Sequence, residues 1–349
     1  MDRKDKKIKA YLYPLTKRLT TGVYNPYLDK FMDSTGSYIH YVNRPHPSNS
    51  GILNLLGFLP GIDMVFLNWA EDIPEKKGGF VQYLFLLSLL KFRRLLGIKI
   101  VWTLHNKFSH SFKKLGMKKK LFKALLYGSD FILTHSREGI AFAESIYPGS
   151  SSKIFYYPHP VIPQDQHTPR PKTYDVLIWG TIAPYKGIDT FLAFLQEKDL
   201  LDRYRILITG KILSSEFQES IKIYERENII IDNRFISNEK LGELIGQSRI
   251  VLFTYSAKSV LSSGVLADSI SYYASVLGPN VGAFAEMGDL GIIKTYDSFE
   301  QLPEILESIR ENENVPDHEK LEEFIRSHTW EHFGVAFADA MKRQGVKKS

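Results

Sequence analysis

The chain has 349 residues, 44% of them hydrophobic, which is enough for two ordinary domains, each with its own core. It contains no cysteine, so a disulfide framework, a thiolate metal site and sulfur redox chemistry are excluded. The opening stretch MDRKDKKIKAYLYP has no apolar core of signal-peptide length, and the longest apolar run, FVQYLFLLSLL, is too short to span a bilayer. We therefore expect a cytoplasmic protein without transmembrane helices.

The net charge of +6 is distributed unevenly along the chain. The window from Lys76 to Ser129 contains thirteen Lys or Arg residues and no Asp or Glu, so the rest of the chain is net acidic by about seven charges. Such a single-sign window exceeds what solubility requires and favours an anionic partner. No recognisable nucleic-acid motif accompanies it, and we expect no nucleic-acid partner.

Short β-rich runs alternate with helical patterns in the first half of the chain. These runs are IKAYLY, SYIHYV, MVFLNW, IKIVWTL and FILTH. The alternation predicts a parallel sheet covered by helices on both faces. The run IKIVWTL leads into His105 and Asn106, and a histidine at the C-terminal end of such a strand can hydrogen-bond a substrate or leaving group. The alternative is a histidine satisfied by neighbouring backbone.

The lysine-rich segment SFKKLGMKKKLFKALLYG predicts an amphipathic helix. Its apolar residues at helical spacing are Leu115, Phe122, Leu125 and Leu126, and its lysines lie mostly elsewhere. This pattern is typical of a helix on an anionic membrane surface. We therefore expect the basic region 91–123 to hold the protein peripherally at the inner face of the plasma membrane. The alternative is a helix whose apolar side is core and whose lysines are solvated.

A proline-rich stretch separates the two halves. Residues 158–173, PHPVIPQDQHTPRPKT, contain five prolines and almost no apolar periodicity, which is typical of a linker. After it, the runs YDVLIWG, YRILITG, NIIID and RIVLFTY repeat the alternation. The sequence predicts an α/β protein with two doubly wound, Rossmann-like domains, 1–165 and 166–325, facing across a ligand-binding cleft, and a C-terminal helix at 326–349.

The stretch WGTIAPYKG lies between a strand and the amphipathic helix IDTFLAFLQ. Gly180 lets the backbone approach a ligand closely, the helix start favours an anion, and Lys186 would add a full positive charge. Its spacing matches neither G-x-x-x-x-G-K-[ST] nor G-x-G-x-x-G. The alternative to a phosphate loop is therefore an ordinary turn with a solvated lysine.

A second helix start suits a diphosphate. Ser262, Ser263 and Gly264 open a helix after RIVLFTY and offer capping hydroxyls and free N–H groups. The alternative is a plain N-cap.

Metal-binding patterns are weak in this chain. HTWEH, residues 328–332, matches H-x-x-E-H, but so short a match occurs easily by chance, and there is no obvious third ligand. Asp-x-Asp is absent, so the usual carboxylate pair for a divalent metal on a nucleotide diphosphate is missing. We expect no metal site, and we expect lysine and helix dipoles to meet phosphate charge.

Taken together, these stretches resemble the GT-B glycosyltransferases, and most closely the family 4-like enzymes of bacterial surface-polysaccharide assembly. The resemblance covers nearly the whole chain, through FLNWAED, KIVWTLHNKFSH, WGTIAPYKGI, RFISNEKLGELIGQSRIVLFTYS, GPNVGAFAE and HTWEHF. It implies a nucleotide-sugar donor, UDP- or GDP-linked, on the C-terminal domain, no further cofactor, and an acceptor on the N-terminal domain. It also implies that the last helix crosses back to the first domain.

The resemblance implies roles for single residues. Lys186 matches the lysine that contacts the donor diphosphate, and His105 matches the cleft histidine beside the transferred sugar. Asp268 lies eighteen residues before Glu286, the interval that marks the ribose-binding position. Backbone near Arg234 and Phe235 would take the base. The full set of donor-binding candidates is Gly22, Gly180, Thr181, Lys186, Lys211, Arg234, Phe235, Ser262, Ser263, Gly264 and Asp268.

Two departures from the family pattern bear on donor binding. Thr181 stands where the family often has an arginine after the first glycine of the phosphate loop. Val260 stands where the first glutamate of the E-x7-E pattern would fall. Lys211 or Lys258 would supply the missing positive charge.

The resulting expectation is a metal-independent hexosyltransferase that moves a sugar from a nucleotide-sugar to a lipid-linked or polysaccharide acceptor. Similarity to family 4 implies retention of configuration, in which a donor phosphate oxygen accepts the acceptor's proton. An inverting enzyme would need a base, for which Glu71, Asp72 or Glu138 are candidates. The alternatives are a non-catalytic GT-B scaffold subunit, supported by the missing arginine and glutamate, and a nucleotide-sugar epimerase.

Overall fold

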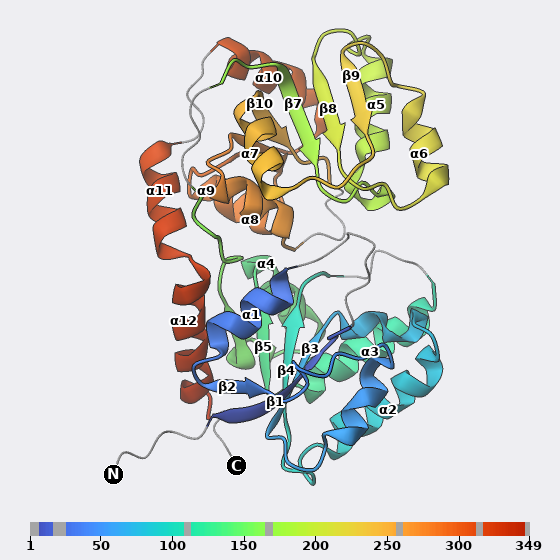
Figure 1. Cartoon of the computed structure of the whole chain (residues 1–349), viewed down its shortest axis with the longest axis vertical. Coiled ribbons are helices and arrows are strands. Elements are labelled where there is room, and N and C mark those ends of the chain that lie inside the picture. The colour runs from blue at the N-terminus through green and yellow to red at the C-terminus, as the bar shows by residue number, and fades with distance from the viewer. Residues whose placement is uncertain are drawn as a thin grey trace. The chain divides into compact units, whose positions relative to one another are not determined.

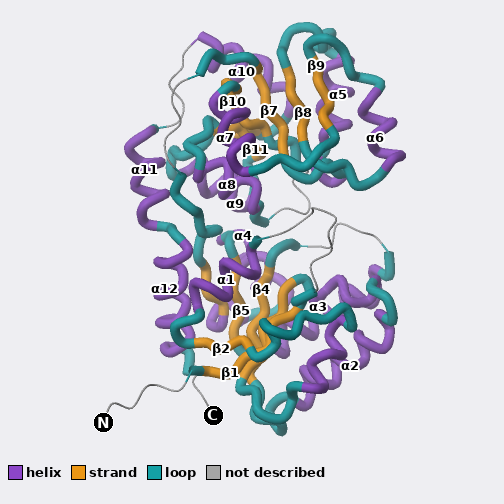
Figure 2. Tube along the Cα trace, viewed as in Figure 1, coloured by secondary structure: helices purple, strands orange, loops and turns teal. Residues whose placement is uncertain are grey.

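The strand-like runs of the sequence form two parallel sheets in the computed structural model, which describes residues 7–16, 26–107, 113–164, 170–255, 261–311 and 317–345. The chain divides into a first unit, Met1–Pro158 with Trp330–Ser349, and a second unit, His159–Thr329. Each unit contains one six-stranded sheet flanked by helices (Figures 1 and 2). The predicted α/β class with two doubly wound, parallel sheets is confirmed.

The sheet of the first unit has the order β2-β1-β3-β4-β5-β6, and its neighbouring strands are parallel. The five predicted runs contain β1 to β5, whereas β6, which has three residues, was not predicted. The elements are β1 (Ile8–Tyr13), α1 (Tyr27–Thr35), β2 (Ile39–Tyr41), η1 (Gly51–Gly57), β3 (Met64–Asn68), η2 (Ala70–Glu75), α2 (Gly79–Phe92), β4 (Lys99–Leu104), α3 (Leu115–Gly128), β5 (Phe131–Thr134), α4 (Arg137–Ile146), η3 (Ser150–Lys153), β6 (Ile154–Tyr156) and α12 (Trp330–Arg343).

The sheet of the second unit has the order β12-β11-β10-β7-β8-β9 and is also parallel throughout. Its elements are β7 (Tyr174–Trp179), η4 (Pro184–Lys186), α5 (Ile188–Glu197), β8 (Ile206–Thr209), α6 (Ser215–Lys222), β9 (Ile229–Asp232), α7 (Asn238–Gly246), β10 (Ser248–Leu252), α8 (Gly264–Ser271), β11 (Val276–Pro279), α9 (Gly282–Asp289), β12 (Lys294–Tyr296), η5 (Phe299–Gln301), α10 (Leu302–Glu311) and α11 (His318–Ser327).

Alternate residues of the second sheet enter two separate cores. Leu177 packs with α7, α8, α9 and α11, whereas Val176 and Ile178 pack with α5, α6 and α10. Because successive side chains of a strand point to opposite faces, this continuous apolar run requires cover on both sides. The helices on both faces therefore follow from the sequence of the strands.

The core of the first unit is completed by its last helix, α12. Phe337 of α12 lies 5.5 Å from Phe31 of α1 and 6.2 Å from Phe66 of β3, measured between ring centroids, and Phe333 lies 5.7 Å from Phe31. These four rings are fully buried. Residues from both ends of the first unit's sequence thus share one aromatic core.

The lysine-rich segment forms α3, but its apolar side does not face outward. Phe122, Leu125 and Leu126 are buried, and Lys118 is 3% exposed with its Nζ 3.3 Å from Asp72 Oδ1 and 2.5 Å from a Glu75 oxygen. The prediction that this apolar side rests on a membrane is therefore wrong, because the same pattern serves to pack a helix onto a core. Within the described ranges, no helix has the length and apolar content needed to cross a bilayer.

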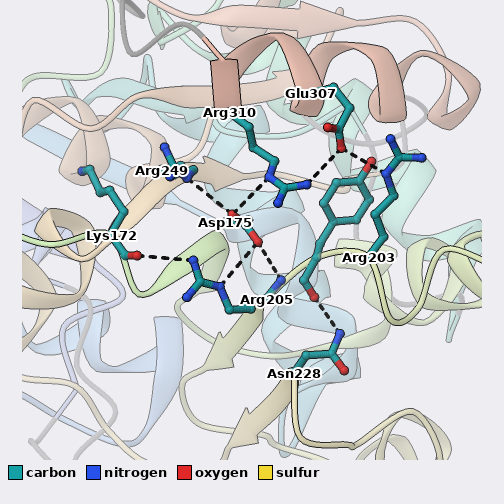
Figure 3. Close-up of polar contacts among 9 residues, drawn as sticks. Lys172, Asp175, Arg203, Arg205, Asn228, Arg249, Glu307 and Arg310 are labelled. Atoms are coloured by element: carbon teal, nitrogen blue, oxygen red, sulfur yellow. Dashed lines mark hydrogen bonds and ion pairs between the residues drawn. The ribbon is translucent and has the colours of Figure 1, made fainter.

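Three arginines hold the amino-terminal end of the second sheet (Figure 3). The buried carboxylate of Asp175 on β7 accepts a hydrogen bond from the backbone N–H of Arg205 at 2.9 Å. Its oxygens also lie 3.4 Å from Arg249 Nε, 3.7 Å from Arg310 Nε and 3.8 Å from Arg205 Nε. This cluster ties β7, β8 and β10 together at the end opposite to the loops that follow them.

Candidate functional site

The topology of the second sheet singles out one position for a ligand. From β7 the chain winds outward through β8 and β9, and from β10 it winds to the other side through β11 and β12. Ligands of doubly wound sheets bind beyond the carboxyl ends of the strands, where the winding reverses. In this unit that point lies between the loops after β7 and β10, which begin at Gly180 and Phe253.

The loop after β7 carries a buried amine. Lys186 is 2% exposed, and its Nζ lies 3.3 Å from the carbonyl oxygen of Trp179 and 5.5 Å from the centre of the Tyr255 ring. Burial alone lowers the pKa of Lys186 to about 7, because no carboxylate among the described residues offsets it. The alternative of a solvated lysine is therefore wrong. A buried amine without a counter-ion is costly, and an anionic ligand would relieve that cost.

Two glycines allow this loop to approach its neighbours closely. Gly180 has φ of +98°, and a Cβ there would lie 3.1 Å both from Lys186 Nζ and from the Val265 side chain on α8. Gly187 has φ of +67°, and a Cβ there would lie 2.5 Å from the carbonyl oxygen of Thr254. The Thr254 hydroxyl donates to the Lys186 carbonyl at 2.6 Å. The loop, the lysine and the first turn of α8 therefore converge.

The start of α8 adds a positive helix end to this position. Ser263 is the N-cap and its hydroxyl accepts from the N–H of Leu266 at 3.3 Å, with the Tyr255 hydroxyl 3.4 Å away. The first N–H groups of a helix have no partner within it and favour an anion. His159 lies beside this end, because its Nε2 is 3.7 Å from where a Cβ on Gly264 would stand. His159 was not predicted, and its only signal is its place between two prolines.

Other predicted donor-binding residues lie in loops at the same edge of the sheet. Thr181 follows β7, and the N–H of Ile182 donates to the carbonyl of the exposed Lys211 at 2.9 Å, which joins the loops after β7 and β8. After β9, the exposed Arg234 has its Nε 2.5 Å from Asp232 Oδ2, and Phe235 is 64% exposed. Their roles in donor binding stay predictions.

The remaining predicted positions lie at or near α8, on α9, or outside the described residues. Ser262 is half-buried just before the N-cap, and Asp268 is half-buried in the middle of α8, while Glu286 lies on α9. Gly22, Lys258 and Val260 lie outside the described residues.

In the first unit, His105 lies at the predicted end of β4. It is 7% exposed, its Nε2 is 3.1 Å from Asn68 Oδ1, and its ring stacks on Trp69 with 4.4 Å between centroids. Tyr27 meets its edge at 5.1 Å, and the Tyr27 hydroxyl lies 2.7 Å from Nε2 of His135. Burial lowers the pKa of His135 to about 4, so its ring is neutral near pH 7. Sequence reasoning missed Asn68, Tyr27 and His135, although His135 also directly follows a strand.

The three candidate bases have different surroundings. Glu71 is 6% exposed, and burial, assisted by the neighbouring Asp72 charge, raises its pKa to about 7. Asp72 pairs with the buried Lys118, and Glu138 pairs with Lys107. Glu71 therefore combines burial with a pKa near the range that a general base requires.

The H-x-x-E-H pattern does not form one helix face. His328 caps the end of α11, where its ring stacks on Phe324 at 4.3 Å, and His332 lies on α12. Across the described residues, no group of three His, Asp or Glu side chains is arranged to hold a metal ion.

No protein-family model matches the chain, and no curated protein sequence matches it. Its fold is similar to HepE from Anabaena in complex with UDP, with a TM-score of 0.68 at 11% identity over 97% of this chain and 100% of that one. Sucrose-phosphate synthase from Thermosynechococcus elongatus gives 0.67 at 13% identity over 98% and 100%. A glycosyltransferase from Rickettsia africae gives 0.60 at 13% identity over 99% and 100%. The chain therefore has the GT-B fold of these glycosyltransferases.

Proposed function

We propose that the protein is a glycosyltransferase whose second unit binds a nucleotide-sugar. The observation that carries this proposal is the buried amine of Lys186, which has no carboxylate partner among the described residues and lies beside the positive end of α8 at the β7/β10 switch point. A diphosphate would supply the negative charge that balances the Lys186 amine and the positive end of α8. The UDP bound to HepE, which has a similar fold, supports a UDP-linked donor.

The chemistry follows from where charge develops. Cleavage of the bond between sugar and phosphate leaves negative charge on the departing nucleoside diphosphate, and Lys186 with the start of α8 would stabilise it. The arriving diphosphate favours the protonated amine, so Lys186 would take up a proton as the donor binds. We propose that these groups replace a divalent metal.

The first unit would bind the acceptor, with His105 beside the transferred sugar. We propose a lipid-linked or polysaccharide acceptor and transfer of a hexose with retention, in which a donor phosphate oxygen takes the acceptor's proton. An inverting reaction would use Glu71, whose pKa of about 7 suits a general base. The acid-free window from Lys76 to Ser129 supports work at an anionic membrane surface of the cytoplasm, as in surface-polysaccharide assembly.

Thermal stabilisation by UDP, GDP, ADP and CMP without metal tests the donor site. A nucleotide at one hundred times its Kd stabilises the folded state by about 2.7 kcal/mol. We expect one nucleotide to stabilise the wild type and Lys186→Ala to lose that effect. Lys222→Ala, at an exposed lysine on α6, is the matched control and should keep it.

Two outcomes would contradict the proposal. If none of the nucleotides stabilises the wild type, the protein is a GT-B scaffold rather than a transferase. If a nucleotide-sugar is converted without any acceptor and no nucleoside diphosphate is released, the protein is an epimerase.

A further inference from the structure

Helix α2 is apolar on its outer side as well as on its inner side. Tyr83, Leu86, Leu89 and Leu90 are buried against the unit, as expected for a surface helix. The opposite side, however, exposes Phe80 and Val81 by 58% each, and Leu84 and Phe92 by 46% each. A helix that is apolar all round is ordinarily surrounded by protein or by lipid. Among the described residues of the first unit, no other element covers this outer side.

The turn after α2 extends this exposed apolar surface. Leu95 is 84% exposed and Leu96 is 51% exposed. We refer to the outer α2 surface as Phe80, Val81, Leu84, Phe92, Leu95 and Leu96. Single exposed apolar residues are normal, but a succession of them on one helix and its following turn marks an interaction site.

The inner side of α2 is fixed, so the helix cannot turn its outer surface inward. Gln82 is 4% exposed; its Oε1 accepts from the N–H of Ile52 at 3.0 Å, and its Nε2 donates to the carbonyl of Lys77 at 2.7 Å. Helix α2 also packs beside α3 within the first unit (Figure 1).

Positive charge around the outer α2 surface favours an anionic partner. Exposed cations bracket it, with Lys77 before α2 and Lys91 and Arg94 at its end. Lys91 shares a helix face with Phe80 and Leu84, because they lie eleven and seven residues before it, close to three and two whole turns of about 3.6 residues. Exposed Lys119, Lys120 and Lys123 lie on the neighbouring α3, and the sequence from Lys76 to Ser129 has no acidic residue.

We propose that the outer α2 surface inserts into the boundary between headgroups and acyl chains of an anionic membrane, with Lys77, Lys91 and Arg94 on the lipid phosphates. The exposed apolar side chains match the acyl chains of such a surface, and the flanking cations match its phosphates, with no Asp or Glu in the sequence from Lys76 to Ser129. The element that enters the bilayer is then α2, and not the apolar side of α3 that the sequence indicated. This inference rests on the proposed membrane location but is independent of the donor site.

Co-sedimentation of the purified full chain with lipid vesicles tests this surface. We expect binding to vesicles of phosphatidylcholine with phosphatidylglycerol, weak binding to phosphatidylcholine alone, and loss of binding as salt rises. Phe80→Ser combined with Leu84→Ser should weaken binding at least about tenfold. The control combines Leu213→Ser and Ile223→Ser, at side chains of the second unit that are 64% and 72% exposed, and should bind as the wild type does.

A thermal melt checks that each variant is folded. If the serine variant does not fold, Lys91→Glu combined with Arg94→Glu changes only exposed charges and should cause a similar loss of vesicle binding. Three results would overturn the proposal: no binding to anionic vesicles, equal binding of both serine variants, or a lipid-free dimer that Phe80→Ser with Leu84→Ser dissociates. Vesicle binding without nucleotide binding would support the proposed membrane surface and contradict only the proposed donor site.

Discussion

Binding of a nucleotide-sugar should weaken as pH rises through the pKa of Lys186. Burial lowers that pKa from 10.5 to about 7, so the free protein carries a charged amine below this pH and a neutral one above it. A bound diphosphate favours the charged form and raises the pKa again. Binding above the pKa of the free protein therefore requires uptake of a proton, which costs free energy that grows with pH.

The size of the effect follows from this linkage. Above about pH 7 the protonated fraction of Lys186 falls about tenfold for each pH unit, so the Kd rises about tenfold, or about 1.4 kcal/mol. Between about pH 6 and about pH 8 the total change is again about tenfold, because the amine is already charged at the lower end. At about pH 7, binding should take up about half a proton.

Isothermal titration with UDP-glucose and GDP-mannose measures both quantities. Repeating the titration in buffers of different ionisation enthalpy gives the number of protons taken up. Lys186→Met keeps an unbranched side chain of similar length but cannot ionise, so it should bind more weakly with a Kd that stays constant across this pH range. Lys222→Met changes an exposed lysine on α6, which is not among the donor-binding candidates, and should keep the slope of the wild type.

A constant Kd for the wild type would refute this reasoning, since Lys186 would then not change charge on binding. The same slope in Lys186→Met would also refute it and assign the proton to another group. If Lys186→Met loses binding although the wild-type Kd does not change with pH, Lys186 is a packing residue of the loop.

Further expectations concern backbone, acid and ion-pair positions. Gly187→Ala should lower the free energy of unfolding in urea by about 2–4 kcal/mol and weaken nucleotide binding, because its Cβ would meet the Thr254 carbonyl. The control Gly149→Ala, with φ of +86° and open space around it, should lower the free energy of unfolding by only about 1 kcal/mol. Equal losses would contradict this. Burial raises the pKa of Glu71 from 4.5 to about 7, so the free energy of unfolding should fall by up to about 3 kcal/mol as pH rises between these values. Glu71→Gln should remove this slope in pH-dependent melts, and an unchanged slope would contradict the reasoning. Asp175→Ala should lower unfolding free energy by about 2 kcal/mol and leave nucleotide affinity unchanged; a change in affinity would show that the cluster also shapes the site.

The sequence predicted the sheets better than their short strands. Runs such as YDVLIWG and IKIVWTL are long, apolar and β-branched, and each forms a strand. The strands β6, β11 and β12 have only three or four residues, and β11 contains a glycine and a proline, which are depleted in strands. The equally short β2 lies within the longer predicted run SYIHYV.

At the candidate site, the sequence predicted the charge but not its surroundings. It indicated a lysine at a strand-to-helix turn, but not that the Lys186 amine lies 5.5 Å from the Tyr255 ring or that the Lys186 carbonyl accepts from Thr254, a residue 68 positions away. His135 follows the predicted run FILTH, but its partner Tyr27 lies 108 positions away, and His159 lies near Gly264, in a distant segment. The apolar side of α3 was misread because core and membrane demand the same helical spacing.

The aromatic core that α12 completes has a consequence for how the protein can be made. The first unit is assembled from segments far apart in the sequence, so a ribosome must release Phe333 and Phe337 before Phe31 and Phe66 can pack against them. The unit that begins first would thus finish last, and its N-terminal portion would wait with exposed aromatic surface during synthesis. A stop codon before α12 would therefore remove the tail of the chain yet damage its beginning, while the continuous stretch His159–Thr329 would keep its own core.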